Sequence, residues 1–267
     1  MPTSQSFPNG SLRSAFRVQL RVLHALLMRE VITRFGRQNL GVLWLVLEPM
    51  IFTVGVASIW TAQGMNHGRG IPIVAFAVTG YSSVLMWRNS ASRSAHAIRE
   101  NKSLLFHRRV QVIDVLLTRT LLETGGATGS FIVLSCFFIF LGWMPPPEDL
   151  LEVIEGWVML AWFGASLALL VGAGNAFSEI VERVWHPVSY LLFPLSGAAF
   201  MVDWMPKSLQ KFVLLLPMIH GTEMLREGWF GDVVRTHYSV QYVVTSCLVL
   251  TLAGLYVQRQ AARRIEH

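Results

Sequence analysis

Hydrophobic residues follow two different patterns on either side of Leu40. Upstream, apolar residues recur every three or four positions from Phe16 to Val31, so they share one face of a helix whose other face carries arginines. Downstream, residues 41–62 form an apolar run whose one ionisable residue is Glu48. About 20 consecutive apolar residues cross a bilayer, whereas a basic helix with one apolar face lies along its surface. The pattern predicts a surface helix that leads into a membrane span.

Five further apolar segments follow the first one along the chain. They are residues 71–87, 121–144, 153–177, 187–202 and 238–257. We therefore predict an all-α membrane protein with an N-terminal region, 1–40, that contains the amphipathic helix, and one six-span transmembrane domain, 41–267. An even number of spans puts both termini on the same side of the membrane.

Two regions between the spans have patterns of their own. Residues 88–119 mix charged and apolar positions, which is typical of a short helix that docks a soluble partner and equally of a solvated amphipathic loop. Residues 203–237 contain an apolar stretch, 209–218, that is too short to cross and is bounded by Pro206 and Pro217. We predict two short re-entrant helices here, on the outer side.

Composition and charge support a membrane location and give the orientation. Hydrophobic residues make up 53% of the 267 positions and charged residues 14%. Alternate loops divide the 22 Lys and Arg residues into 17 on one side and five on the other, and the richer side, which includes both termini, is expected to face the cytoplasm. The net charge of +6 therefore reflects topology, and we expect no nucleic-acid partner. The apolar run 41–62 exceeds the roughly 7–15 residues of a signal core, so we expect no cleaved signal peptide.

Several kinds of chemistry are missing from the sequence. No phosphate-binding G-x-x-x-x-G-K-[ST] motif occurs, so ATP would have to be bound by another subunit. His220 and Glu223 can share a helix face, but two ligands do not make a zinc site, and we expect neither a metal nor a cofactor on this chain. Glu48 has two interpretations: it takes part in transport chemistry, or it pairs with an arginine near the cytoplasmic face.

Three segments carry a resemblance to a known family. They are REVITRFGRQNLGVLWLVLEP at 29–49, LSGAAFMVDWMP at 195–206 and GTEMLREGWFG at 221–231. Together they resemble the permease subunit of type-2 ABC exporters, most closely the branch that exports capsular polysaccharide in Gram-negative bacteria. The resemblance covers essentially the whole chain in order.

The resemblance implies a fold and a set of partners. It implies an inner-membrane homodimer that binds two separate ATPase subunits, which would hold ATP and Mg, and that moves a lipid-linked polysaccharide to the periplasm with the help of a periplasmic adaptor and an outer-membrane export protein. It also implies an interface helix at 16–32, a coupling helix at 101–112, re-entrant helices at 207–216 and 220–228, and a pathway lined by spans one and five.

Candidate site residues follow from these expectations. The substrate-path candidates are Arg29, Arg34, Arg37, Trp44, Glu48, Trp60, Arg88, Tyr190, Phe193, Phe200 and Trp204. The ATPase-coupling candidates are Asn101, Leu104, Leu105, Phe106, Arg108 and Arg109. Aromatic faces guide sugars, and the arginines favour an acidic glycan at the cytoplasmic entrance. The same residue types also serve as interfacial anchors and bind lipid head groups.

Other functions remain open at this point. An exporter of the same architecture for O-antigen, teichoic acid, lipid or drug is the nearest alternative, and an ATP-independent carrier is a more distant one. A membrane glycosyltransferase needs a catalytic acid/base pair, but Glu148, Asp149 and Glu152 form a solvated acidic loop in this interpretation.

Overall fold

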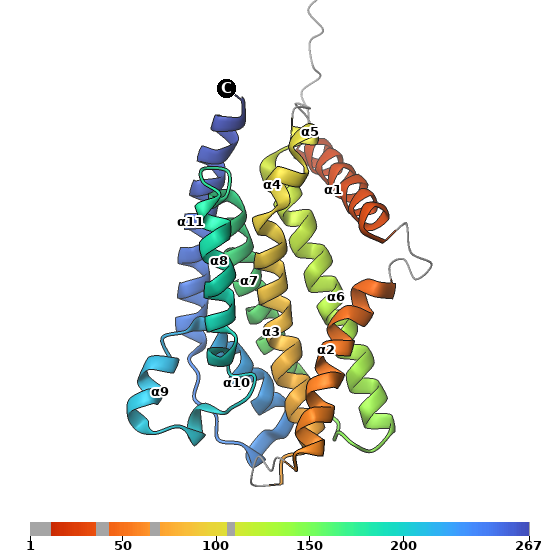
Figure 1. The fold of residues 1–267 in the computed structure, drawn as a ribbon, viewed down its shortest axis with the longest axis vertical. Helices are drawn as coiled ribbons and strands as arrows, with labels where there is room; N and C mark the ends of the chain where they lie inside the picture. The colour runs from red at the N-terminus through yellow and green to blue at the C-terminus, as the bar shows by residue number, and fades with distance from the viewer. Residues whose placement is uncertain (1–11, 36–42, 65–69, 106–109, 267) are drawn as a thin grey trace, which may run out of the picture.

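Helices joined by turns make up the structure, a computed structural model that describes residues 12–35, 43–64, 70–105 and 110–266 (Figure 1). The long helices are α1 (Leu12–Phe35), α2 (Leu43–Ala62), α3 (Ile73–Ala95), α6 (Val112–Phe140), α7 (Leu150–Gly174) and α11 (Val240–Glu266). The shorter ones are α4 (Ala97–Glu100), α5 (Lys102–Leu105), α8 (Ile180–Leu192), α9 (Lys207–Val213) and α10 (Pro217–Phe230), with 3-10 turns η1 (Pro194–Ser196), η2 (Val202–Trp204) and η3 (Gly231–Val233). No strand occurs in these ranges, which confirms the predicted all-α class.

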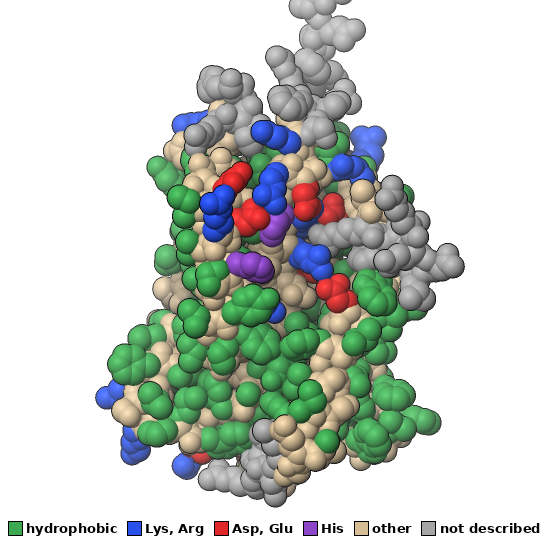
Figure 2. Space-filling view, viewed as in Figure 1, with side chains coloured by type: hydrophobic (Ala, Val, Ile, Leu, Met, Phe, Trp, Pro, Cys, Tyr) green, Lys and Arg blue, Asp and Glu red, His purple; other side chains and the backbone are tan. Residues whose placement is uncertain are grey.

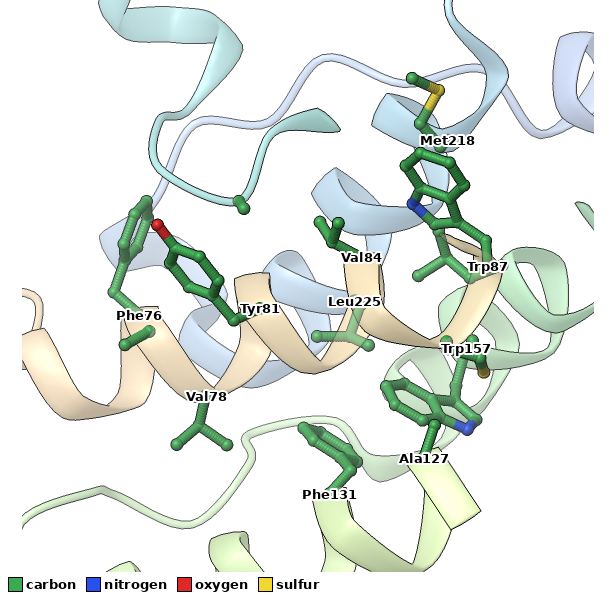
Figure 3. Packing of buried hydrophobic residues seen from close by; sticks show 14 of the residues in the cluster. Phe76, Val78, Tyr81, Val84, Trp87, Ala127, Phe131, Trp157, Met218 and Leu225 are labelled. Atoms are coloured by element: carbon green, nitrogen blue, oxygen red, sulfur yellow. The ribbon is translucent and has the colours of Figure 1, made fainter. Parts of the chain in front are cut away.

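Helix α3 lies at the centre of the bundle. Helices α2, α6, α7 and α8 pack against it, and α7 also supports α10 and α11 (Figure 1). The close-up of the core shows Val84 and Trp87 of α3 near Leu225 of α10, with Phe131 of α6 and Trp157 of α7 on the other side (Figure 3). The Phe131 and Trp157 rings stack with their centroids 4.5 Å apart. This part of the core therefore consists of side chains from α3, α6, α7 and α10, with α3 in the middle.

Four helices are long and apolar enough to cross a membrane. They are α2, α6, α7 and the part of α11 from Val240 to Arg263. Within the described ranges, α3 is less apolar, because serines, Asn89 and two arginines occur along it, and α8 is short, with only 13 residues. The protein is thus a multi-pass membrane protein, and the two other predicted spans correspond to its central helix and a short helix.

Helix ends differ from the predicted spans where polar groups or prolines intervene. Helix α3 continues beyond Trp87 to Ala95, and α8 starts at Ile180 but ends at Leu192, well before the predicted end of the fifth span. Pro194 cannot donate a backbone hydrogen bond, and Gly197 has a left-handed φ of 81°, so the chain turns back after α8. A capping box of Gln111 and Asp114 starts α6 at Val112, earlier than predicted.

Helix α2 contains a proline near its first third. Pro49 lacks the N–H group that would bond to the carbonyl of Leu45, so the helix loses one internal hydrogen bond there. The Thr53 hydroxyl donates to the Pro49 carbonyl at 3.0 Å. The backbone hydrogen bonding of α2 is therefore interrupted at Pro49, directly after Glu48.

The two ends of the bundle differ in character. Helices α1, α4 and α5 lie at the same end as the C-terminus, and α9 and α10 lie toward the opposite end (Figure 1). Figure 2 shows basic and acidic side chains gathered toward the first end, above a broad hydrophobic zone. We call the first end the charged end and the other the α10 end. The junction at Leu40, where the surface helix is predicted to lead into the first span, lies outside the described residues.

A glycine contact sets how closely α10 approaches α7. A Cβ atom on Gly156 would lie 2.6 Å from the Leu225 backbone nitrogen, closer than real contacts allow. Gly156→Val is therefore expected to push α10 away and lower the free energy of unfolding by about 1–3 kcal/mol. Gly125→Val is the matched control, because a Cβ atom on Gly125 meets nothing within 4 Å. Equal melting temperatures of the two purified variants would contradict this packing.

Candidate functional site

Six aromatic residues form a continuous row along one side of α3. They are Phe52 and Trp60 of α2, Phe76 and Tyr81 of α3, and Phe193 and Trp204 from the segment after α8. We call them the ring path. Phe76 and Tyr81 project from the same side of α3 (Figure 3).

Neighbouring rings of the path are within contact distance of each other. The Tyr81 ring centroid lies 5.6 Å from that of Phe193 and 5.4 Å from that of Trp60. The Trp60 ring lies 6.2 Å from Phe76, which stacks on Trp204 at 5.2 Å with 23° between the planes. Because each pair adds about 0.5–1.5 kcal/mol beyond the burial of its surface, the row is a stable feature of the bundle.

The rings of the path that belong to α3 are buried, whereas two of the outer rings are exposed. Phe76 is fully buried and Tyr81 is nearly so, whereas Phe52 is 41% and Trp204 38% exposed. Phe52 joins the row at 5.8 Å from Tyr81. The exposed faces of Phe52 and Trp204 thus leave aromatic surface free at the edge of the path.

Arg88 lies at one end of the ring path. Its guanidinium carbon is 4.6 Å from the centroid of the Tyr190 ring and 5.5 Å from that of Phe193. Tyr190 is 60% exposed, so this end of the path is accessible. The structure thus brings together Arg88, Tyr190 and Phe193, three of the predicted substrate-path residues.

Glu48 forms an ion pair with an arginine of α3. The Arg93 Nη2 atom lies 2.9 Å from a Glu48 carboxylate oxygen, and the Arg93 Nε lies 3.9 Å from Glu123 of α6. This contact supports the ion-pair interpretation of Glu48 over transport chemistry. Arg93 links α2, α3 and α6 at the charged end.

Arg119 joins four helices at the charged end, and no feature of the sequence singled it out. It lies on α6 with only 5% of its side chain exposed, and its Nη2 is 3.1 Å from the Glu30 carboxylate of α1. It also pairs with Glu100 of α4, and its Nη1 donates to the Arg93 carbonyl of α3 at 2.8 Å. We call Arg119 and its three partners the Arg119 hub. The hub ties the amphipathic helix to the bundle.

The predicted coupling segment is only partly available as a surface. Asn101 is buried, and both polar atoms of its side chain are hydrogen-bonded. Its amide group donates to the Ala97 carbonyl at 2.9 Å, and its Oδ1 accepts from Arg29 at 2.7 Å. Leu104 is partly exposed, and Leu105 is half-buried against a small core of α4, α6 and α7. Arg29 therefore contacts the coupling segment, where it holds a predicted coupling residue.

Arg226 organises the α10 end of the path. It is fully buried on α10, and its Nη1 donates to the carbonyls of Gly197 at 2.6 Å and Phe200 at 2.7 Å. Its Nη2 donates to the Ala198 carbonyl at 2.8 Å, and its guanidinium carbon lies 3.7 Å from the centroid of the Phe76 ring. One side chain thus fixes the turn after α8 against α3, next to the last rings of the path.

Two other polar residues of α10 also bond to backbone. The Glu223 carboxylate accepts from the N–H groups of Val202 at 3.1 Å and His237 at 3.0 Å. Burial lowers the pKa of His220, so its ring is neutral, with Nδ1 accepting from the Ser239 N–H at 3.0 Å and Nε2 donating to the Leu214 carbonyl at 2.8 Å. Both side chains are therefore committed to the fold. No three His, Cys, Asp or Glu side chains within the described ranges are grouped as metal ligands.

The remaining predicted residues lie apart from the ring path or outside the described side chains. Trp44 is in the first turn of α2 and makes no described ring contact, and Phe200 packs beside Val202 in a small core under α9. The side chain of Arg34 and residues Arg37, Phe106, Arg108 and Arg109 are not described.

Sequence reasoning missed five residues that the structure brings to the site. They are Phe52, Phe76, Tyr81, Arg119 and Arg226. Phe76 and Tyr81 are five residues apart, about 140° around a helix, so their spacing carried no signal, whereas Arg226 was a charge within a glycine-rich segment. Arg119 carried no comparable signal, because it sits among several other basic residues.

The fold and the site together define a multi-pass membrane protein with a charged end and an aromatic path. Residues 21–230 match the membrane component of ABC-2 type transporters, and the chain belongs to this family. It is 40% identical over 256 residues to the capsule polysaccharide export inner-membrane protein CtrC of Neisseria meningitidis serogroup A, covering 96% of this chain and 97% of that protein. It is 39% identical to the corresponding BexB of Haemophilus influenzae with the same coverage, and 28% identical to the polysialic acid transport protein KpsM of Escherichia coli, over 92% of this chain and 96% of that protein.

Proposed function

We propose that this chain is the membrane subunit of an ATP-driven exporter that moves lipid-linked capsular polysaccharide across the inner membrane, from the cytoplasm to the periplasm. The observation that carries the proposal is the near full-length similarity to capsule polysaccharide export inner-membrane proteins. Membership of the ABC-2 family supports the partnership with separate ATPase subunits. ATP and Mg would be bound there, in agreement with the absence of a phosphate-binding loop from this sequence.

The assembly is proposed to be a homodimer with two ATPase subunits at the charged end. In this arrangement the chain crosses the membrane six times, with α3 and α8 as the two further crossings, and α9 and α10 lie on the periplasmic side. Both termini face the cytoplasm, since the basic residues concentrate at the end that holds α1 and α4. A periplasmic adaptor and an outer-membrane export protein would continue the route, with no part for nucleic acid.

The ring path is proposed to be the surface along which the glycan moves. It runs from Arg88, nearer the charged end, to Trp204, which precedes α9. Its rings come from α2 and the α8 region, the first and fifth predicted spans, and from the central helix. A row of contacts of similar strength lets a polymer advance in steps without a deep trap.

Gene deletion tests the proposed function. In a strain that lacks the genes for this chain and for its ATPase, we expect surface capsule to be lost and polysaccharide to accumulate in the cytoplasm. We expect export to return only when this chain and its matched ATPase are both supplied. The measurement is immunodetection of glycan on intact and on permeabilised cells. An ATPase variant that cannot hydrolyse ATP is the control. Restored export with that variant contradicts ATP coupling, and normal capsule in the deletion strain contradicts the cargo.

A further inference from the structure

Arg88 carries a charge that the described structure does not neutralise. The fifteen residues that precede it in α3, from Ile73 to Trp87, include no Asp, Glu, Lys or Arg. No carboxylate of the described residues lies within ion-pair distance of Arg88, and its Nε atom is buried without a hydrogen-bond partner there. Arg93, Arg99 and Arg119 are all paired. Among the described arginines of α3, α4 and α6, Arg88 is the one without an ion pair.

The surroundings of Arg88 only partly compensate its charge. A charge within a transmembrane segment is costly, and a cation that lies over an aromatic ring regains only part of that cost. The rings of Tyr190 and Phe193 lie on the guanidinium, which orients it while leaving its donors unused. An arginine fork of this kind binds carboxylate or phosphate through two parallel hydrogen bonds.

We propose that Arg88 is a binding site for an oxyanion of the transported molecule, at the inner end of the ring path. The inference rests on the proposed function and narrows the cargo to glycans that carry carboxylates or phosphates. Phe193 touches both Arg88 and Tyr81, so an oxyanion held by Arg88 sits beside the first sugar-binding rings. The exposed Tyr190 leaves the approach open. The oxyanion comes either from the sugars of the polymer or from the phosphate of its lipid anchor.

Glycan-stimulated ATP hydrolysis by the complete complex in lipid nanodiscs tests the site. The probes are a soluble oligosaccharide with one carboxylate per sugar, the same oligosaccharide after reduction of its carboxyl groups, and a phosphate-linked glycolipid with a neutral glycan. The wild-type complex is expected to respond to one of the anionic probes at a concentration about ten- to a hundredfold lower than to the neutral one, the range of a charged hydrogen bond. Preference for the carboxylated oligosaccharide assigns the site to the sugars, and preference for the glycolipid assigns it to the anchor.

Substitutions then assign the preference to Arg88. Arg88→Gln is expected to remove the difference between anionic and neutral probes, while Arg88→Lys keeps part of it because it retains charge but not the fork. Arg183→Gln, at an exposed arginine of α8 that pairs with Glu179, is the matched control and should keep the full preference.

Two outcomes overturn the inference, and a third overturns the function beneath it. Equal weakening of all probes by Arg88→Gln shows a structural role, and an unchanged preference shows that another residue binds the anion. If no probe stimulates the wild-type complex, the proposed function fails and the site with it.

Discussion

Arg226→Ala is expected to lower the free energy of unfolding by about 3–5 kcal/mol and to reduce surface capsule at least tenfold. The Arg226 side chain is fully buried, and the substitution leaves three backbone carbonyls without their donor. It also removes the cation from the face of Phe76. The turn that places Trp204 against Phe76 therefore loses its support, and the ring path is broken at this end.

The measurement is thermal unfolding of the purified protein together with surface capsule at matched protein levels. Arg226→Lys should fall between wild type and alanine, since one ammonium group replaces the charge but cannot reach all three carbonyls at once. Arg235→Ala, on an exposed part of the loop after α10, is the matched control and should behave as wild type. Equal stability of Arg226→Ala and Arg235→Ala would falsify the role of Arg226.

Arg119→Gln is expected to reduce export about tenfold or more while ATP hydrolysis by the complex continues. The substitution removes the charge that holds Glu30 of α1 and Glu100 of α4 against α6. Breaking one side of a buried ion pair costs about 3–5 kcal/mol, because the other charge stays buried. If the ATPase acts at the charged end, as proposed, its movement is no longer passed on to α1, α4 and α6 together.

A double substitution separates this role from simple destabilisation. Glu30→Gln removes the carboxylate charge that faces Arg119, so the double variant should be more stable than the sum of the two single effects predicts. Export should stay low in the double variant, because the link between α1 and α6 is still missing. Arg183→Gln, at an exposed arginine of α8, is the control and should retain export. Recovered export in the double variant would rule out the linking role.

The sequence was sufficient to predict the helices that apolar runs define. Residues 41–62, 153–177 and 238–257 correspond closely to α2, α7 and α11, because a long apolar run has few alternatives to a membrane helix. The fifth predicted span was too long: its apolar residues continue past Pro194, but the proline and the left-handed Gly197 end the helix. A hydrophobic run alone does not predict where a helix ends, because the end depends on backbone hydrogen bonding.

Tertiary pairing accounts for what the sequence did not reveal. Helix α3 continues past its apolar part, where Arg93 pairs with Glu48 and Glu123, which are distant along the chain. Trp60, Phe193 and Trp204 were predicted as separate aromatic candidates. Their connection depends on Tyr81 and Phe76, whose contacts arise only when α2 and the α8 region meet over α3. Whether the candidate residues touch the glycan stays a prediction that the substitutions above address.

The proline of α2 gives the ring path a mechanical property. Pro49 lies next to Glu48, which is held by Arg93, so the helix has its weak point beside its anchor. Trp60 lies eleven residues further on, about 16 Å along the axis at 1.5 Å per residue. A bend of about 10° at the proline would move the Trp60 ring by about 3 Å, enough to separate it from Tyr81. A small change of helix angle at Pro49 would therefore open or close the row of rings.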